Sequence, residues 1–177
     1  MVNYNTYMVT QPSTPTAYKS VFSNEFCEIM ENETTGFKSL HSLKSFKPGD
    51  LISPFNASYV STKPSYLTVQ VGYRKHITLL PQFLQYINHS CNPNAFFNTT
   101  TMELTALRPI EPGDDFSFFY PSTEWDMAQP FQCHCNEAGC LGLISGAAFI
   151  PEETLKKYQL TDFILGRLKS RLKKARA

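Results

Sequence analysis

Charged side chains are scarce in this chain. Only 18% of its 177 residues are Asp, Glu, Lys or Arg, below the usual share of about a quarter. The formal net charge is +1, so the sequence as a whole exerts no general attraction toward nucleic acid or an acidic membrane surface. We therefore expect no direct nucleic-acid binding and no membrane partner.

Long apolar runs are also missing. Nowhere do about 18 consecutive apolar residues occur, the length that a membrane-spanning helix requires. Residues 1–10 have neither a basic start nor a continuous apolar segment, so they do not resemble a secretory signal. We expect an intracellular protein, cytoplasmic or nuclear. In that reducing setting its five cysteines are expected to bind metal or take part in chemistry rather than form disulfides.

Glycine is sparse, with 8 residues against 12 prolines, and this balance favours turns and short strands over long helices. Hydrophobic residues make up 42% and aromatic residues 14%, enough apolar surface for one core. The length fits a single domain. The totals therefore predict one β-rich domain.

Apolar and polar residues alternate through residues 65–80, a pattern typical of strands, and Pro81 ends this stretch. Residues 95–98 and 102–108 are predicted to pair across the intervening threonines. From Pro151 onward, apolar residues recur at helical spacing, which predicts a C-terminal helix. Its cationic end is interpreted as a solvated helix terminus that suits the helix dipole, or alternatively as a docking surface or nuclear address.

Three cysteines, Cys133, Cys135 and Cys140, lie within eight residues as C-x-C-x4-C. Zinc prefers four tetrahedral ligands, with sulfur at about 2.3 Å. The triplet therefore predicts a zinc site that needs one further ligand. The candidates are Cys91, Cys27, His134 and His89.

The alternative for this cluster is a set of ordinary buried thiols, because free cysteine packs as a small hydrophobe. Tight clustering beside Gly139 and polar residues favours metal binding instead. Cys27 differs from the triplet, because it stands alone among the apolar residues Phe26, Ile29 and Met30. We expect it to be a packed core thiol.

The run Asn88-His89-Ser90-Cys91-Asn92-Pro93-Asn94 consists of polar side chains and one proline. Such Asx-rich stretches readily form ordinary turns. Its amide and imidazole groups are equally suited to recognising a base edge or a carboxylate, and His89 fits a partly buried structural histidine as well as a catalytic base. From the residues alone, a structural loop and a functional site remain equally open.

Three motifs resemble those of one family. Tyr86-Ile87 together with the polar run is similar, without a gap, to the signature of SET-domain methyltransferases. Gly113-Asp114-Asp115-Phe116-Ser117-Phe118-Phe119-Tyr120 is similar to the second signature of that family, commonly Gly-Glu-Glu-Leu-Thr-Phe-Asp-Tyr. The cysteine triplet followed by Leu141-Gly142 resembles its post-SET segment. The resemblance is strong over residues 83–142, weaker back to about Gly36, and absent for residues 1–20.

This resemblance implies the fold class. We expect a β-rich α+β protein with the SET-domain fold, made of several small β-sheets, a zinc-bound post-SET segment and a C-terminal helix. The expected divisions are an N-terminal arm (1–20), the SET domain (21–126), the post-SET zinc segment (127–146) and a C-terminal basic helix (147–177). By the same resemblance, Cys91 joins Cys133, Cys135 and Cys140 around zinc, and His134 is left out.

The resemblance also implies an activity, S-adenosylmethionine-dependent N-methylation of a lysine exposed on a protein substrate. Tyr120 would orient the amine beside the transferring methyl group, and Phe118 would limit how many methyl groups are added. The residues implied to contact S-adenosylmethionine are Asn88, His89, Tyr86, Lys38 and Leu40.

Two departures from the family pattern support alternative functions. The family has a Gly-x-Gly motif where this chain has residues 37–42, with the single Gly36 nearby, and Phe119 stands where an Asp is usual. The alternatives are a SET-fold enzyme that acts on a small-molecule metabolite and a non-catalytic SET-fold binding module that keeps the zinc.

Overall fold

The structure is a computed structural model that describes residues 17–175, with side chains up to Lys173. Residues 1–16 and 176–177 lie outside it. Most of the predicted N-terminal arm (1–20) therefore falls outside the described residues.

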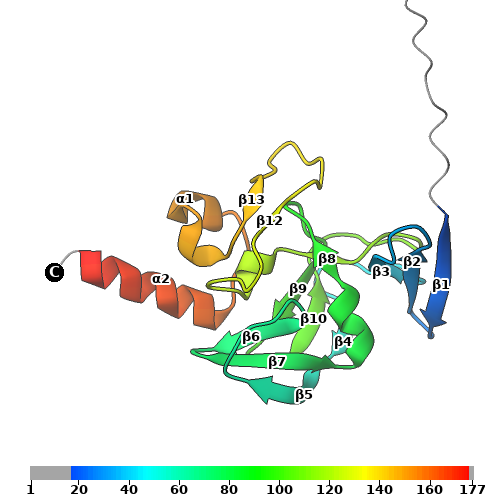
Figure 1. Ribbon diagram of the computed structural model, residues 1–177, viewed down its shortest axis with the longest axis horizontal. Helices are drawn as coiled ribbons and strands as arrows, with labels where there is room; N and C mark the ends of the chain where they lie inside the picture. Colours follow the sequence, from blue (N-terminus) through cyan, green and yellow to red (C-terminus); the bar gives the residue numbers. More distant parts are fainter. Residues whose placement is uncertain (1–16, 176–177) are drawn as a thin grey trace, which may run out of the picture.

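The first sheet is an antiparallel meander of β1 (Tyr18–Ser23), β2 (Cys27–Asn32) and β3 (Lys38–Ser42). Asparagine side chains organise both of its turns. The Oδ1 atom of Asn24 accepts hydrogen bonds from the backbone amides of Phe26 and Cys27, and the Oδ1 atom of Asn32 accepts from those of Thr34 and Thr35. This sheet lies at one end of the molecule, opposite the C-terminal helix (Figure 1).

Two further antiparallel sheets build the middle of the molecule. One has the order β4 (Leu51–Pro54), β10 (Glu103–Ala106), β9 (Ala95–Asn98). The other has the order β5 (Asn56–Ser61), β7 (Lys75–Leu80), β6 (Thr68–Gly72). The predicted strands within 65–80, their end before Pro81 and the pairing of residues 95–98 with 102–108 are confirmed.

A short parallel pair brings the two signature motifs together. After the 3-10 helix η1 (Gln82–Tyr86), β8 (Asn88–His89) pairs with β11 (Ser117–Phe118), and Asn88 lies opposite Ser117. The 3-10 helix η2 (Tyr120–Ser122) follows β11 directly. The pairing places Tyr120 beside the polar run, although the two are about thirty residues apart in sequence. The elements from β1 to β11 are called the sheet body below.

The cysteines lie in a closed excursion of the chain, residues 127–146, called the cysteine segment below. Within it β12 (Phe131–Gln132) pairs with β13 (Leu143–Ile144). Its base is closed by a hydrogen bond from the Met127 amide to the Ser145 carbonyl, at 3.0 Å. Gly146 has a φ of +115°, and a Cβ atom there would lie 2.6 Å from the Trp125 carbonyl oxygen. Only glycine permits this closure.

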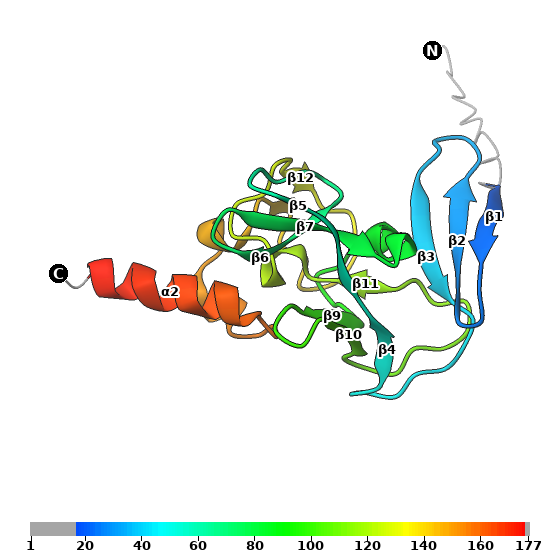
Figure 2. The same cartoon turned by 90° about the horizontal axis from the view of Figure 1, so that it is seen from below.

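The C-terminal region contains two helices instead of one continuous helix from Pro151. After the 3-10 helix η3 (Ala147–Phe149), α1 covers Glu152–Leu155 and α2 covers Asp162–Ala175. The break has a tertiary cause, because Thr161 is held by η2. Its Oγ1 and its amide both donate to the Ser122 carbonyl, at 2.9 and 3.1 Å. From this anchor α2 extends away from the sheets (Figure 2).

The architecture confirms the predicted β-rich α+β class, with small sheets and a C-terminal helix. The main core lies inside the sheet body, and a second cluster forms where η3, α1 and α2 pack together. Within residues 17–175, no helix has the length and apolar character needed to cross a membrane.

Candidate functional site

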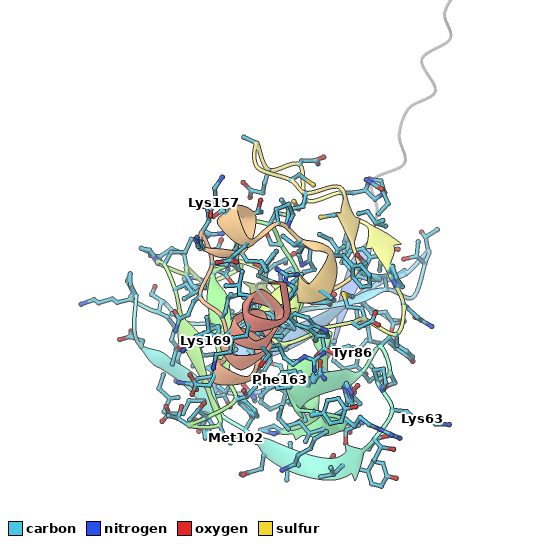
Figure 3. All side chains as sticks on the ribbon, turned by 90° about the vertical axis from the view of Figure 1, so that its left-hand side faces the viewer. Lys63, Tyr86, Met102, Lys157, Phe163 and Lys169 are labelled. Atoms are coloured by element: carbon cyan, nitrogen blue, oxygen red, sulfur yellow. The ribbon has the colours of Figure 1, made fainter. Side chains whose placement is uncertain are left out.

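A cavity of about 470 Å³ opens in the sheet body and continues onto the start of the cysteine segment. Its volume falls in the range of small-molecule sites, about 300–1,000 Å³. The lining is mostly apolar and aromatic and includes Leu79, Leu84, Phe97, Phe118, Tyr120 and Phe131. The loop after β5 adds Tyr66 to the lining, while Lys63 of the same loop points away from the molecule (Figure 3).

One part of the cavity wall joins β3 to η1 and β8. The side-chain amide of Asn88 donates a 3.1 Å hydrogen bond to the Lys38 carbonyl. The Lys38 ammonium lies 5.5 Å from the centre of the Tyr86 ring and 3.2 Å from an oxygen of Glu31. Three of the predicted cofactor residues, Lys38, Tyr86 and Asn88, are therefore brought together. Gly36, with φ of +69°, lines the cavity next to them.

The other two predicted cofactor residues are not in the cavity lining. Leu40 is fully buried in the main core, and its carbonyl accepts a 2.8 Å hydrogen bond from the Phe116 amide. His89 lies between the cavity and the cysteines. Its Nδ1 accepts a 3.3 Å hydrogen bond from the Tyr120 amide, and its Nε2 is 3.4 Å from the Cys91 sulfur. Burial lowers the pKa of His89 to about 4, so its ring is neutral at pH 7.

Tyr120 presents a neutral phenol to the cavity. Its hydroxyl donates a 3.3 Å hydrogen bond to the Ile87 carbonyl. Its ring packs between Phe118, at 4.6 Å between centroids, and Phe131, at 5.9 Å. Burial raises the pKa of Tyr120 to about 12, so the hydroxyl keeps its proton at neutral pH, and while it donates to Ile87 its oxygen can accept a hydrogen bond from a bound group.

The neighbouring aromatic residues face opposite ways. Phe118 lines the cavity and meets the edge of Phe97 at 4.8 Å. Phe119 is absent from the cavity lining and stacks on Tyr158, with centroids 3.7 Å apart. The side chain at the position where the family usually has Asp therefore contributes to the second core, and the polarity of the cavity is unaffected by it.

Sequence reasoning missed Glu124, a nearly buried carboxylic acid that lines the cavity. Its Oε1 accepts a 2.7 Å hydrogen bond from the Gln70 amide and a 3.3 Å hydrogen bond from the Thr123 hydroxyl. Burial raises the pKa of Glu124 to about 7. The available signal in the sequence was that Glu124 is an acidic residue shortly after Tyr120. Its burial depends on contact with β6, and the local sequence does not reveal that contact.

The four predicted metal ligands come together. The sulfur atoms of Cys91, Cys133, Cys135 and Cys140 all lie within 4.8 Å of one another. Tetrahedral zinc with sulfur at about 2.3 Å places its ligands about 3.8 Å apart, so a small contraction suffices. His134 does not belong to this group among the residues that the structure describes.

The surroundings of these thiols fit metal binding. Burial raises the pKa of Cys91 to about 12 and of Cys133 to about 11. At Cys135 burial also acts to raise the pKa, but hydrogen bonds from the amides of Glu137 and Cys91 outweigh it and bring the value to about 7. The Leu141 amide points at the Cys91 sulfur, at 3.4 Å. A four-sulfur set that accepts backbone amide hydrogen bonds suits a soft divalent cation.

Cys27 confirms the prediction of a packed thiol. It is fully buried in the main core, away from the other four cysteines, and burial raises its pKa to about 11.

Comparisons with known proteins agree with this geometry. Residues 7–121 match the family model described as SET domain. Methyltransferase flvH of Aspergillus flavus is 37% identical over 142 residues, which is 79% of this chain and 79% of that protein.

Two further relatives are much longer than this chain. The H3 lysine-36 specific histone-lysine N-methyltransferase of Kluyveromyces lactis is 33% identical over 88 residues, 46% of this chain and 12% of that protein. The protein of the same description in Saccharomyces cerevisiae is 29% identical over 103 residues, 55% of this chain and 14% of that protein. The match therefore spans only a small part of these two relatives.

Proposed function

The chain belongs to the SET-domain family and is a SET-type methyltransferase, and we propose that it methylates an amine nitrogen. The proposed substrate is a lysine side chain of a protein. The observation that carries the proposal is the position of Tyr120. Its side chain lines a cavity whose wall also contains Asn88 and Phe118, at the point where β8 and β11 pair.

The reaction needs a neutral amine, whereas free lysine has a pKa of about 10.4. S-adenosylmethionine, when bound, supplies a methyl group on a sulfonium centre. An apolar, aromatic cavity favours the uncharged amine by desolvation. Tyr120 and Phe118 would orient that amine, and such positioning contributes up to about 7–11 kcal/mol of the acceleration in favourable cases.

The residues proposed to hold S-adenosylmethionine are Lys38, Tyr86 and Asn88. The volume of the cavity suits a ligand of this size, and Gly36 offers an open backbone beside them, with no atom near the position of a Cβ. His89 and Leu40 would act indirectly, His89 through the Tyr120 amide and Leu40 through the backbone of β3.

The cysteine cluster is proposed to hold one zinc ion as the post-SET site, with Cys91, Cys133, Cys135 and Cys140 as ligands. The donor set and the mutual approach of the sulfur atoms support this assignment. Zinc would fasten residues 127–146 to the sheet body, so its binding energy becomes folding energy. Phe131 in that segment forms part of the cavity wall.

A small-molecule amine is the second candidate substrate. The relative matched over 79% of both chains is named only as a methyltransferase, whereas those named for histone H3 lysine 36 match over about half of this chain. A non-catalytic binding role is disfavoured, because the family and the named relatives are those of methyltransferases.

Calorimetric titration of the purified protein with S-adenosylmethionine tests the proposal. We expect saturable binding, and no binding at millimolar concentration would contradict the assignment. If it binds, Tyr120→Phe should lose transfer to the true substrate on a lysine peptide array or in metabolite extracts. Tyr59→Phe is the matched control, because Tyr59 is exposed on β5 and absent from the cavity.

Phe118 is proposed to leave space for more than one methyl group. Mass spectrometry of the product should show a second methyl group with the wild-type chain. Phe118→Tyr, which adds a hydroxyl to this part of the cavity, should shift the product toward a single methyl group. An unchanged product distribution would contradict this role.

A further inference from the structure

Two charged side chains line the cavity among residues 17–175, and they differ in their partners. Lys38 is ion-paired with Glu31 at 3.2 Å. Glu124 has no cationic partner among the side chains that the structure describes. The nearest basic group is the His76 Nδ1, 3.9 Å from the Glu124 Oε2, too far for a hydrogen bond.

The two oxygens of Glu124 are used differently. Oε1 is held by the Gln70 amide and the Thr123 hydroxyl, while no described group donates a hydrogen bond to Oε2. Among the described side chains, the shielded polar atoms that lack a partner are the His76 Nδ1 and the Ser122 Oγ. The Glu124 Oε2 is not one of them, and the Glu124 side chain lines the cavity.

The groups around this carboxylate do not neutralise it. Burial lowers the pKa of His76 on β7, so this ring is neutral at pH 7. Tyr120 on η2 keeps its proton, and Lys38 is already paired. A buried carboxylate without a counter-ion is costly, and a cationic ligand would remove that cost.

We propose that Glu124 recognises the substrate as an alkyl amine, binding the ammonium group through Oε2 and then accepting one of its protons. In that step an N–H bond breaks, its electron pair stays on nitrogen, and an O–H bond forms on Glu124. The products are a neutral amine and a neutral carboxylic acid. This inference rests on the proposed function, since it gives the substrate class and the source of the neutral amine.

The environment favours proton transfer by changing the pKa of both the donor and the acceptor. Burial raises the pKa of Glu124 to about 7, which makes it a stronger base than an ordinary glutamate. The same desolvation lowers the pKa of a bound ammonium. A base that titrates near the working pH is the most effective one.

Ligand-observed NMR titrations at pH 8 test the recognition, with n-pentylamine and n-pentanol as probes of matched length. We expect the wild-type chain to bind the amine at least tenfold more tightly than the alcohol. Glu124→Gln should abolish this preference, and Glu124→Asp, which keeps the charge, should retain part of it. Glu33→Gln, an exposed change of equal charge, should behave as wild type.

A preference that survives in Glu124→Gln, or that is absent from the wild-type chain, would overturn the inference. Thermal melting of each variant separates loss of binding from loss of folding. Titration of the same samples with S-adenosylmethionine separates the two proposals. If the cofactor binds but the amine preference is absent, only this inference fails. If the cofactor does not bind, the methyltransferase assignment fails while the amine preference is still measured.

A peptide with a single lysine distinguishes the two sources of the amine. Binding that requires both the lysine and Glu124 indicates a protein substrate. Binding of pentylamine alone, with the same dependence on Glu124, indicates a small-molecule amine.

Discussion

The sheet body and the cysteine segment are held together in different ways. The sheet body buries a large cluster of aliphatic and aromatic side chains, with Phe55, Phe97 and Phe116 almost fully enclosed. The cysteine segment has two strands of two residues each, and it buries only Cys133 and Ile144 in the cluster that it forms with Cys91 of the sheet body. Apolar burial can account for the first region, whereas the second region has little of it and would depend on the proposed zinc ion.

This difference matters for the site, because the cavity takes its walls from both regions. Phe118 and Tyr120 come from the sheet body or follow it directly, and Phe131 comes from the cysteine segment. In the proposed function, the chemistry is therefore carried by the sheet body, while the closure of the cavity depends on the segment that would bind zinc. The predictions below separate the two contributions.

The largest effect is expected from Cys135→Ser. A structural zinc ion contributes about 10–16 kcal/mol in isolated zinc-finger peptides, and most of this should be lost from the cysteine segment. Zinc content should fall from about one equivalent, and amide exchange should accelerate in residues 127–146 while the sheet body stays protected.

Cys27→Ser is the matched control for that prediction. It should lower the melting temperature, because it places a hydroxyl in the main core at a cost of about 1–3 kcal/mol, but the zinc content should stay the same. Loss of zinc from Cys27→Ser, or retention of zinc in Cys135→Ser, would contradict the proposal that only the cysteine segment depends on zinc.

Tyr120→Phe should affect chemistry without affecting either fold. Removing one donor at a reacting centre typically lowers the rate by about 10²–10³-fold. Single-turnover methyl transfer should fall by that factor, with zinc content and S-adenosylmethionine affinity unchanged. A rate close to that of the wild-type chain would remove Tyr120 from the mechanism.

Glu124→Gln should stabilise the sheet body above neutral pH. The folded chain holds a proton on Glu124 up to about pH 7, whereas the unfolded chain releases it near 4.5, so the wild-type free energy of unfolding falls as pH rises through this window. Urea unfolding should show Glu124→Gln more stable than wild type by about 1–3 kcal/mol at pH 8. The difference should shrink toward pH 4.5, and a difference independent of pH would refute this explanation.

The smallest effect concerns the pair His41 and Asp115, which joins β3 to the segment before β11 at 2.8 Å. The hydrogen bond to Asp115 raises the pKa of His41 above its ordinary 6.5. The pair therefore stabilises the fold below pH 6.5, and this stabilisation is lost as pH rises through the folded value. Because Asp115 is largely exposed, Asp115→Asn should cost at most about 0.5 kcal/mol at pH 5.5 and nothing measurable at pH 8.5, by urea unfolding.

Features that depend on neighbours in sequence could be predicted from the sequence. The strands in 65–80, the pairing across residues 99–101 and the close approach of Cys133, Cys135 and Cys140 all follow from spacing within a short window. Cys91 lies far from the triplet and was assigned only through the resemblance to a family. The cluster of four sulfur atoms agrees with that assignment.

Features that depend on distant contacts could not be predicted. Glu124 is buried because β6, more than fifty residues earlier, supplies the Gln70 amide. The predicted single helix is divided because Thr161 is tied to Ser122, 39 residues away. Phe119 leaves the cavity because Tyr158 offers a ring to stack on. In each case the partner lies outside any local pattern.

The short distance along the chain between Phe131 and Cys133 has a thermodynamic consequence. Phe131 forms part of the cavity wall, Cys133 belongs to the four-cysteine cluster, and a single residue separates them. If the cluster binds zinc, a ligand that requires Phe131 in the cavity wall must raise the affinity for zinc by the same factor by which zinc raises the affinity for that ligand. A chelator and a substrate would therefore oppose each other without ever sharing a binding site.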